Sequence, residues 1–118
     1  MQYMVLSFES NEDFAARTDQ KRVADYIGGW RAYTEALQKA GILVAGAGLE
    51  LVHTATTVRL RDGKRQVQDG PFADTKEQLG GYYIVDVPNL DQALEWAARC
   101  PAAVNGSVEV RPLIPPFR

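Results

Sequence analysis

The sequence predicts an α+β fold, and three observations predict it. Two stretches repeat apolar residues at the three- and four-residue spacing of a helix, one in each half of the chain. Several short stretches either alternate or are apolar on both faces, as strands do. Glycine, proline and Asp-Gly punctuate the boundaries between them. We expect one domain that spans residues 1–118.

The N-terminal part is expected to form a strand, a loop and a helix. Residues 2–8 are apolar on both faces, which is typical of a strand buried on both sides. Residues 9–19 are polar and are expected to be a loop. A helix is expected from about Lys21 to Ala40, where Gly41 can end it in the left-handed conformation. Its apolar stripe comprises Val23, Tyr26, Ile27, Trp30, Tyr33 and Leu37.

The central part is expected to consist of strands. Residues 42–51 are apolar but contain Gly46 and Gly48, which predict a bulged or irregular strand. Residues 55–61 alternate, and Asp62-Gly63 predicts a hairpin turn that leads into a partner strand over residues 64–68.

The C-terminal part repeats the strand–helix–strand order. We expect a strand over residues 81–87 and, after an Asn89 N-cap, a helix over 90–99 that buries Leu90, Leu94 and Ala97 or Ala98. A last strand is expected over residues 107–113. The order is therefore β-α-β-β-β-β-α-β, which is ferredoxin-like once the hairpin is removed. Two helices cover only one face of such a sheet, so we expect a homodimer through the sheet faces.

Composition excludes several classes of function. The net charge of −2 and pI near 5.3 argue against nucleic acid as a partner. No apolar run approaches the roughly 18 residues of a membrane span, and residues 1–8 resemble a strand more than a signal peptide. The single cysteine, Cys100, favours a reducing, cytoplasmic location. No metal-ligand spacing, phosphate loop or dinucleotide motif is visible, so we expect no metal or cofactor.

Asp69 is the leading candidate for chemistry, because the turn Asp69-Gly70-Pro71 could aim its carboxylate at one place. It could act as a general acid or base, a cation ligand or a substrate anchor. The alternative is that it caps its own turn. Phe72 is expected to be a core residue or a pocket wall. Lys76 and Glu77 either contribute to a site or form surface ion pairs.

Two arginines and one histidine complete the candidates from residue chemistry. Arg59 and Arg111 lie in the middle of predicted strands, and Glu109 shares a face with Arg111. Arg59, Glu109 and Arg111 either pair with one another inside the barrel, or one of the arginines binds an anionic ligand such as a carboxylate. His53, the only histidine, is either a weak catalytic candidate or a surface residue.

One block of the chain resembles a known family. Residues 69–77 read Asp-Gly-Pro-Phe-Ala-Asp-Thr-Lys-Glu, which resembles the signature of the DGPF-domain branch of the YCII-related family. The resemblance extends through residues 55–59, 80–83, 95–103 and 108–113. It implies the fold of a dimeric α+β barrel.

The resemblance also implies possible functions. The wider family is thought to use a His–Asp pair with the histidine on the first helix, and some relatives are dehydrochlorinases or isomerase-like enzymes acting on small aromatic-derived acids. A gapless count back from Gly41 places Trp30 at that histidine position. Trp30 is therefore either a core residue, as its place on the helix stripe favours, or a wall of the cleft, as the resemblance implies. Bacterial DGPF members are associated with extracytoplasmic-function sigma factors.

Two hypotheses follow. One is a homodimer that binds a small anionic or aromatic metabolite, with acid/base chemistry such as isomerisation or elimination at Asp69. In that case Trp30, Arg59, Phe72 and Arg111 would line or support one cleft. The other is a non-enzymatic accessory or regulatory module linked to sigma-factor or signalling systems.

Overall fold

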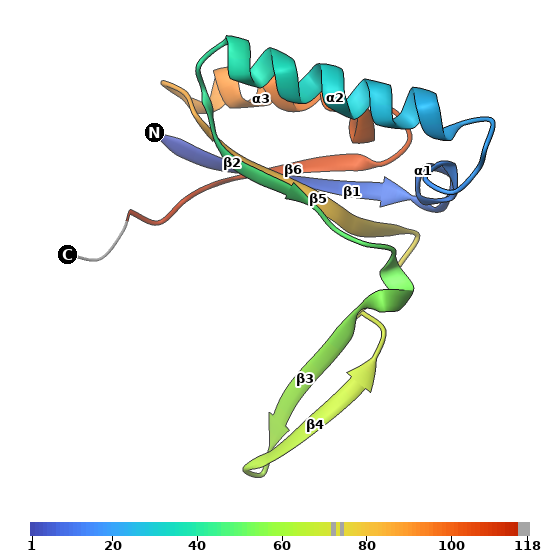
Figure 1. Ribbon diagram of the computed structural model, residues 1–118. Helices are drawn as coiled ribbons and strands as arrows, with labels where there is room; N and C mark the ends of the chain where they lie inside the picture. The colour runs from blue at the N-terminus through green and yellow to red at the C-terminus, as the bar shows by residue number, and fades with distance from the viewer. Residues whose placement is uncertain (72, 74, 116–118) are drawn as a thin grey trace.

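A four-stranded antiparallel sheet forms the centre of the molecule, with the strand order β2-β5-β1-β6. A computed structural model describes residues 1–71, 73 and 75–115. The strands of the sheet are β1 (Gln2–Ser10), β2 (Leu43–Gly48), β5 (Glu77–Asp86) and β6 (Ser107–Pro112). Helices α2 (Val23–Lys39) and α3 (Leu90–Ala98) lie together on one face of this sheet (Figure 1). This arrangement confirms the predicted ferredoxin-like α+β fold.

The inserted hairpin projects away from the sheet instead of joining it (Figure 1). Its strands are β3 (Thr56–Arg61) and β4 (Lys64–Asp69), which form a separate two-stranded sheet. Asp62 and Gly63 both have positive φ, at 53° and 73°, as the predicted two-residue turn requires. A short 3₁₀ helix, η1 (Val52–Thr54), leads into the hairpin, and a second, η2 (Pro101–Ala103), follows α3.

The predicted loop over residues 9–19 is wrong in its first part. Strand β1 continues to Ser10, and helix α1 (Asn11–Ala16) follows directly. The Ser10 side chain caps this helix by accepting a hydrogen bond from the Asp13 N–H. Acidic Glu12 and Asp13 stand in the first turn, where the helix dipole favours negative charge. The helix was not predicted because these capping residues lie in a polar segment that has no apolar stripe.

The start of β5 also differs from the prediction, because β1 is longer than expected. Strand β5 begins at Glu77 and pairs with the far end of β1, with Ser10 opposite Glu77. The register shifts between Ser7 and Phe8, whose partners are Gly81 and Leu79. Gly80 is therefore the extra residue of a β-bulge beside the end of β1.

Small residues of α3, not its leucines, face the core. Ala93 and Ala97 are buried, whereas Leu90 and Leu94 are each 47% exposed, contrary to the prediction. Asn89 does cap the helix, as predicted, by accepting from the Gln92 N–H. The compact core combines Val5, Leu37, Val85, Ala93 and Cys100. Close contact between α3 and the sheet favours alanine at the contact positions, which turns the larger leucines outward.

Strand β1 alternates in burial although it is apolar on both faces. Tyr3, Val5, Ser7 and Glu9 are buried on the helix side, and the residues between them are half-buried. The cross-strand partners Met4–Ile84 and Leu6–Tyr82 lie on the opposite face, which the two helices leave open (Figure 1). This open apolar face is the surface for which the sequence predicted a partner.

Candidate functional site

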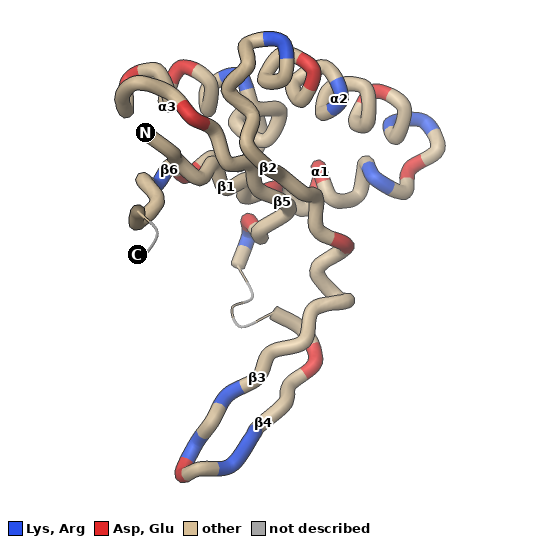
Figure 2. Tube along the Cα trace, turned by 60° about the vertical axis from the view of Figure 1, so that its left-hand side comes forward, with Lys and Arg blue, Asp and Glu red and all other residues tan. Residues whose placement is uncertain are grey.

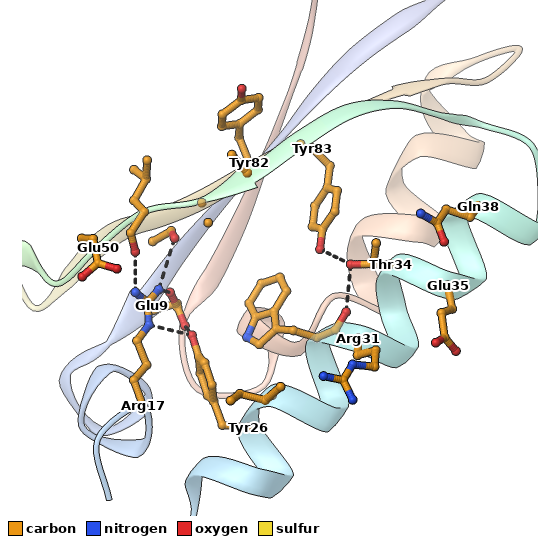
Figure 3. A pocket seen from close by; sticks show the side chains of 18 residues that line it. Glu9, Arg17, Tyr26, Arg31, Thr34, Glu35, Gln38, Glu50, Tyr82 and Tyr83 are labelled. Carbon is orange, nitrogen blue, oxygen red and sulfur yellow. Dashed lines mark hydrogen bonds and ion pairs between the residues drawn. The ribbon is translucent and has the colours of Figure 1, made fainter.

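A cavity of about 920 Å³ lies between α2 and the edge formed by β2 and β5. We call it the main cleft. One wall consists of α2 side chains, and the opposite wall is formed by residues 46–50, at the end of β2 and just beyond it, together with residues 80–83 of β5 (Figure 3). Its lining includes Glu9, Arg17, Tyr26, Trp30, Thr34, Glu35, Gly46, Ala47, Glu50, Gly80 and Tyr83. Its volume lies within the range usual for small-molecule sites.

Aromatic rings form much of the helical side of the main cleft. The Trp30 ring lies 6.4 Å from Tyr26 and 6.3 Å from Tyr83, measured between ring centroids. The planes of Trp30 and Tyr83 are inclined by only 18°. The Tyr83 hydroxyl is 2.5 Å from Thr34 Oγ1, and Thr34 Oγ1 donates to the Trp30 carbonyl oxygen at 2.9 Å. This network fixes the rings across the gap between helix and sheet.

A buried charged cluster closes one end of the main cleft (Figure 3). Glu9 is only 1% exposed, and Arg17 Nη2 donates to its Oε2 at 2.6 Å. The Tyr26 hydroxyl donates to Glu9 Oε1 and accepts from Arg17 Nε at 2.9 Å. A carboxylate is costly to bury unless it is paired and hydrogen-bonded, and here it is both.

The β-bulge makes room for this cluster. A Cβ atom added to Gly80 would lie 1.7 Å from Glu9 Oε2 and 3.1 Å from Arg17 Nη2. Only glycine leaves space for the carboxylate at this position. The Gly80 carbonyl oxygen also accepts from Arg17 Nη2 at 3.2 Å, and the Leu49 carbonyl oxygen accepts from Arg17 Nη1. Arg17 therefore joins α1, α2 and the β2–β5 edge.

Two tyrosines of the main cleft, Tyr26 and Tyr83, have raised pKa values and stay protonated at neutral pH. Burial, followed by the hydrogen bond to Glu9, raises the pKa of Tyr26 to about 12. Burial also raises the pKa of Tyr83. Both hydroxyls are therefore neutral groups that can donate one hydrogen bond and accept others.

A second cavity, of about 560 Å³, lies at the base of the hairpin. We call it the hairpin hollow. It brings together two predicted residues, His53 of η1 and Asp69 at the end of β4, with Phe14 and Pro71 nearby. Asp69 is exposed, and no hydrogen bond joins its carboxylate to another described residue. Gly70, with φ of 93°, makes the predicted turn and donates to the Ala55 carbonyl oxygen at 2.7 Å.

The predicted single cleft is wrong, because Trp30 lines the main cleft while Asp69 and His53 line the hairpin hollow. Arg111 lies on β6, where its Nε forms an ion pair with Glu109 Oε2 at 2.6 Å. Arg59 lies on β3 of the projecting hairpin, so the predicted three-residue cluster is divided.

The remaining predicted site residues lie at the start of β5 or in the segment that precedes it. Lys76 is exposed and lines neither cavity. Glu77 Oε1 accepts a hydrogen bond from Ser107 Oγ at 2.5 Å, which ties β5 to β6. Phe72 lies outside the described residues.

Sequence reasoning missed Glu9, Arg17 and the site role of Tyr26. One signal for Glu9 was available, because it continues the alternation of Tyr3, Val5 and Ser7 and so places a carboxylate on the buried side of β1. Arg17 has no such local signal.

Two classes of feature are not found in the described part of the chain. No group of three or more His, Cys, Asp or Glu side chains there is arranged to hold a metal ion. None of the helices described has the length and hydropathy of a membrane-spanning segment.

Comparisons with known proteins support the fold described above. The YCII-related domain family model matches residues 1–117. A protein of Rhizobium meliloti (strain 1021), itself described as uncharacterised, is 39% identical over 118 residues, covering 96% of this chain and 92% of that protein. The fold is similar to 5-chloro-2-hydroxyhydroquinone dehydrochlorinase (TftG) from Burkholderia phenoliruptrix AC1100, solved in complex with 2,5-dihydroxybenzoquinone. That likeness has a TM-score of 0.55 at 15% identity and covers 97% of this chain and 94% of the other. The family match and the similarity to the Rhizobium protein show that the chain belongs to the YCII-related domain family.

Proposed function

We propose that the protein binds a small aromatic metabolite in the main cleft. The observation that carries this proposal is a cavity of about 920 Å³ that combines the Trp30 and Tyr83 rings with a buried carboxylate, Glu9. Concave sites lined by apolar rings with a few fixed polar groups are typical of small-molecule binding. The ligand of TftG is also a single substituted ring, which supports the same ligand size.

The enzymatic form of this proposal is acid/base chemistry, such as isomerisation or elimination, on the bound ring. In the main cleft we assign proton transfer to Glu9, the buried carboxylate that lines it. Asp69 remains the proposed proton-moving group for a ligand that reaches the hairpin hollow, and His53, which lines the same cavity, remains a second catalytic candidate. Both assignments depend on a ligand being bound, so binding is the property to test first.

Binding can be tested through the two tryptophans of the chain. Trp30 lines the main cleft, whereas Trp96 lies on α3 with the Arg99 guanidinium 4.2 Å from its ring centroid. A ¹H–¹⁵N spectrum contains one indole cross-peak for each, and Trp30→Phe assigns them. We expect a panel of phenols, aryl ethers and aryl carboxylates to include compounds that shift the Trp30 peak and leave the Trp96 peak in place. If no compound shifts the Trp30 peak selectively, the proposal fails.

We also propose a homodimer through the open face of the sheet. Met4, Leu6, Phe8, Tyr82 and Ile84 are half-buried on that face, and neither helix covers them (Figure 1). A continuous apolar sheet face is stabilised when a second sheet covers it.

A second candidate function is that of an accessory module, and the projecting hairpin favours it. Val58, Leu60 and Val67 of the hairpin are 55–67% exposed. Basic residues lie near its far end on both strands, namely Arg61, Lys64 and Arg65, on either side of the Asp62-Gly63 turn (Figure 2). This apolar and basic arm could bind an acidic protein surface. Replacing Val58 and Leu60 by serine should then abolish binding of the partner protein, while ligands still shift the Trp30 indole cross-peak. If the double variant loses both partner binding and the ligand-induced shift, this candidate function is contradicted.

A further inference from the structure

The hydrogen-bond inventory of the main cleft shows what kind of ligand its polar groups can still bind. A phenolic hydroxyl has one proton and two acceptor lone pairs. The Tyr26 proton is directed to Glu9 Oε1, and Arg17 Nε donates to one of the Tyr26 lone pairs. One lone pair of Tyr26 therefore remains, so this hydroxyl can accept a further hydrogen bond but has none to donate.

The Tyr83 hydroxyl at the other side of the Trp30 ring also has its proton committed to a protein atom. The single proton of Thr34 Oγ1 is directed to the Trp30 carbonyl oxygen at 2.9 Å. The short contact between Thr34 Oγ1 and the Tyr83 hydroxyl therefore has Tyr83 as the donor. Tyr83, like Tyr26, keeps only accepting capacity.

Arg17 supplies almost no donors to a ligand, although it is the arginine at the buried end of the cleft. A guanidinium has five N–H bonds. Four of them are directed to protein atoms, namely the Tyr26 hydroxyl, Glu9 Oε2 and the carbonyl oxygens of Leu49 and Gly80. The bidentate pairing by which arginine binds a carboxylate needs two free N–H bonds on adjacent nitrogens. Arg17 is therefore a positioning residue for Glu9 and Tyr26, not an anion receptor.

The charges around the cleft also disfavour an anionic ligand. The ionisable side chains that line it comprise three carboxylates, from Glu9, Glu35 and Glu50, and two guanidiniums, from Arg17 and Arg31. Because Glu9 and Arg17 neutralise each other at 2.6 Å, the remaining rim carries more negative than positive charge. An entering carboxylate meets like charge, which disfavours it.

We propose that the ligand of the main cleft is a ring that carries hydroxyl or amino hydrogen-bond donors, and that the cleft discriminates against ring carboxylates. The Tyr26 and Tyr83 hydroxyl oxygens accept from the ligand, and the Trp30 ring between them provides the stacking surface. This inference rests on the proposed function, and it reverses the ligand chemistry that the sequence suggested, in which an arginine binds a carboxylate.

The test compares three one-ring probes on the wild-type protein, with the Trp30 indole cross-peak as the readout. Resorcinol carries two donors, 1,3-dimethoxybenzene has the same ring without donors, and benzoate carries a carboxylate. We expect resorcinol to bind about tenfold more tightly than 1,3-dimethoxybenzene, which is the effect of one to two net hydrogen bonds. Benzoate should bind more weakly than either.

Matched variants locate the effect. Tyr26→Phe and Tyr83→Phe should each weaken resorcinol about threefold to tenfold and leave 1,3-dimethoxybenzene unchanged. Tyr3→Phe is the control, because the Tyr3 hydroxyl donates to Met1 Sδ at 3.4 Å and Tyr3 lines neither cavity. If Tyr26→Phe fails to fold, Tyr83→Phe and the wild-type ranking still decide the question.

The outcomes separate this inference from the proposed function. If benzoate or 1,3-dimethoxybenzene binds as tightly as resorcinol, the cleft binds rings and the inference about donors is overturned. If the tyrosine variants lower the affinity for all three probes equally, the tyrosine hydroxyls do not accept hydrogen bonds from ligand donors. In that case the inference is again overturned. If no probe shifts the Trp30 peak, both the inference and the proposed function fail.

Discussion

Replacing Glu9 by glutamine removes a buried negative charge while it keeps the size of the side chain. Glu9 is 1% exposed, and it accepts from Arg17 Nη2 and from the Tyr26 hydroxyl. An amide has one oxygen and one NH₂ group, so it cannot accept from both neighbours. Whichever way the amide is turned, its NH₂ group faces Arg17 or Tyr26, and Arg17 loses its counter-charge.

The expected cost follows from the burial of the pair. Removing one partner of a buried salt bridge typically costs about 3–5 kcal/mol of unfolding free energy. The Arg17 side chain is 19% exposed, so water can solvate part of its charge. We therefore expect a loss near the lower end, about 3 kcal/mol, measured by urea denaturation at fixed protein concentration.

Glu35→Gln is the matched control for this measurement. Glu35 lines the same cleft but is exposed, so its replacement should change the free energy of unfolding by no more than about 0.5 kcal/mol. If Glu9→Gln loses less than about 1 kcal/mol relative to Glu35→Gln, the Glu9–Arg17–Tyr26 cluster does not stabilise the fold as argued.

Three further predictions concern the bulge, the tyrosine and the open face. Gly80→Ala should lower the free energy of unfolding by about 1–3 kcal/mol, because the new Cβ would lie 1.7 Å from Glu9 Oε2. Gly48→Ala is the control and should retain the wild-type melting temperature, because a Cβ there has no atom within 4 Å. Because the pKa of Tyr26 rises from 10.0 to about 12 on folding, the unfolded chain releases this proton first, so stability should fall as pH rises from 10 to 12. Tyr26→Phe should lessen that fall, and an unchanged pH dependence of urea stability would contradict the assignment. Leu6→Glu on the open face should dissociate the proposed dimer in light scattering, whereas Leu94→Glu, on an exposed position of α3, should not.

Much of the fold could be predicted because its signals are local. The stripe on α2, the Asp62-Gly63 turn, the Asn89 cap and the left-handed Gly41 all depend on residues that are near neighbours in the sequence. Helix α1 was missed because its capping signal lies in a polar segment without an apolar stripe. The exposed leucines of α3 were misjudged because helical periodicity identifies an apolar face but not the distance at which that face meets the sheet.

The site was less predictable, because its bonds join distant parts of the chain. Trp30 could be placed at the cleft by the family resemblance. Arg17, by contrast, bonds to carbonyl oxygens 32 and 63 residues away, at Leu49 and Gly80. The sequence marks Gly80 only as one of two adjacent glycines, and the reason for a glycine there appears only when β1 and β5 are paired.

The sequence by itself determined the order of the six strands and the two long helices, and it carried the family resemblance, because periodicity, caps and turns act over a few residues. Only the tertiary structure decided that Asp69 and Trp30 belong to different cavities, and that a buried Glu9 lies at the end of the main cleft. It also decided that Arg17 is committed to protein acceptors. Where a hydrogen bond is directed depends on which strands and helices meet in space, and no local pattern of residues specifies that meeting.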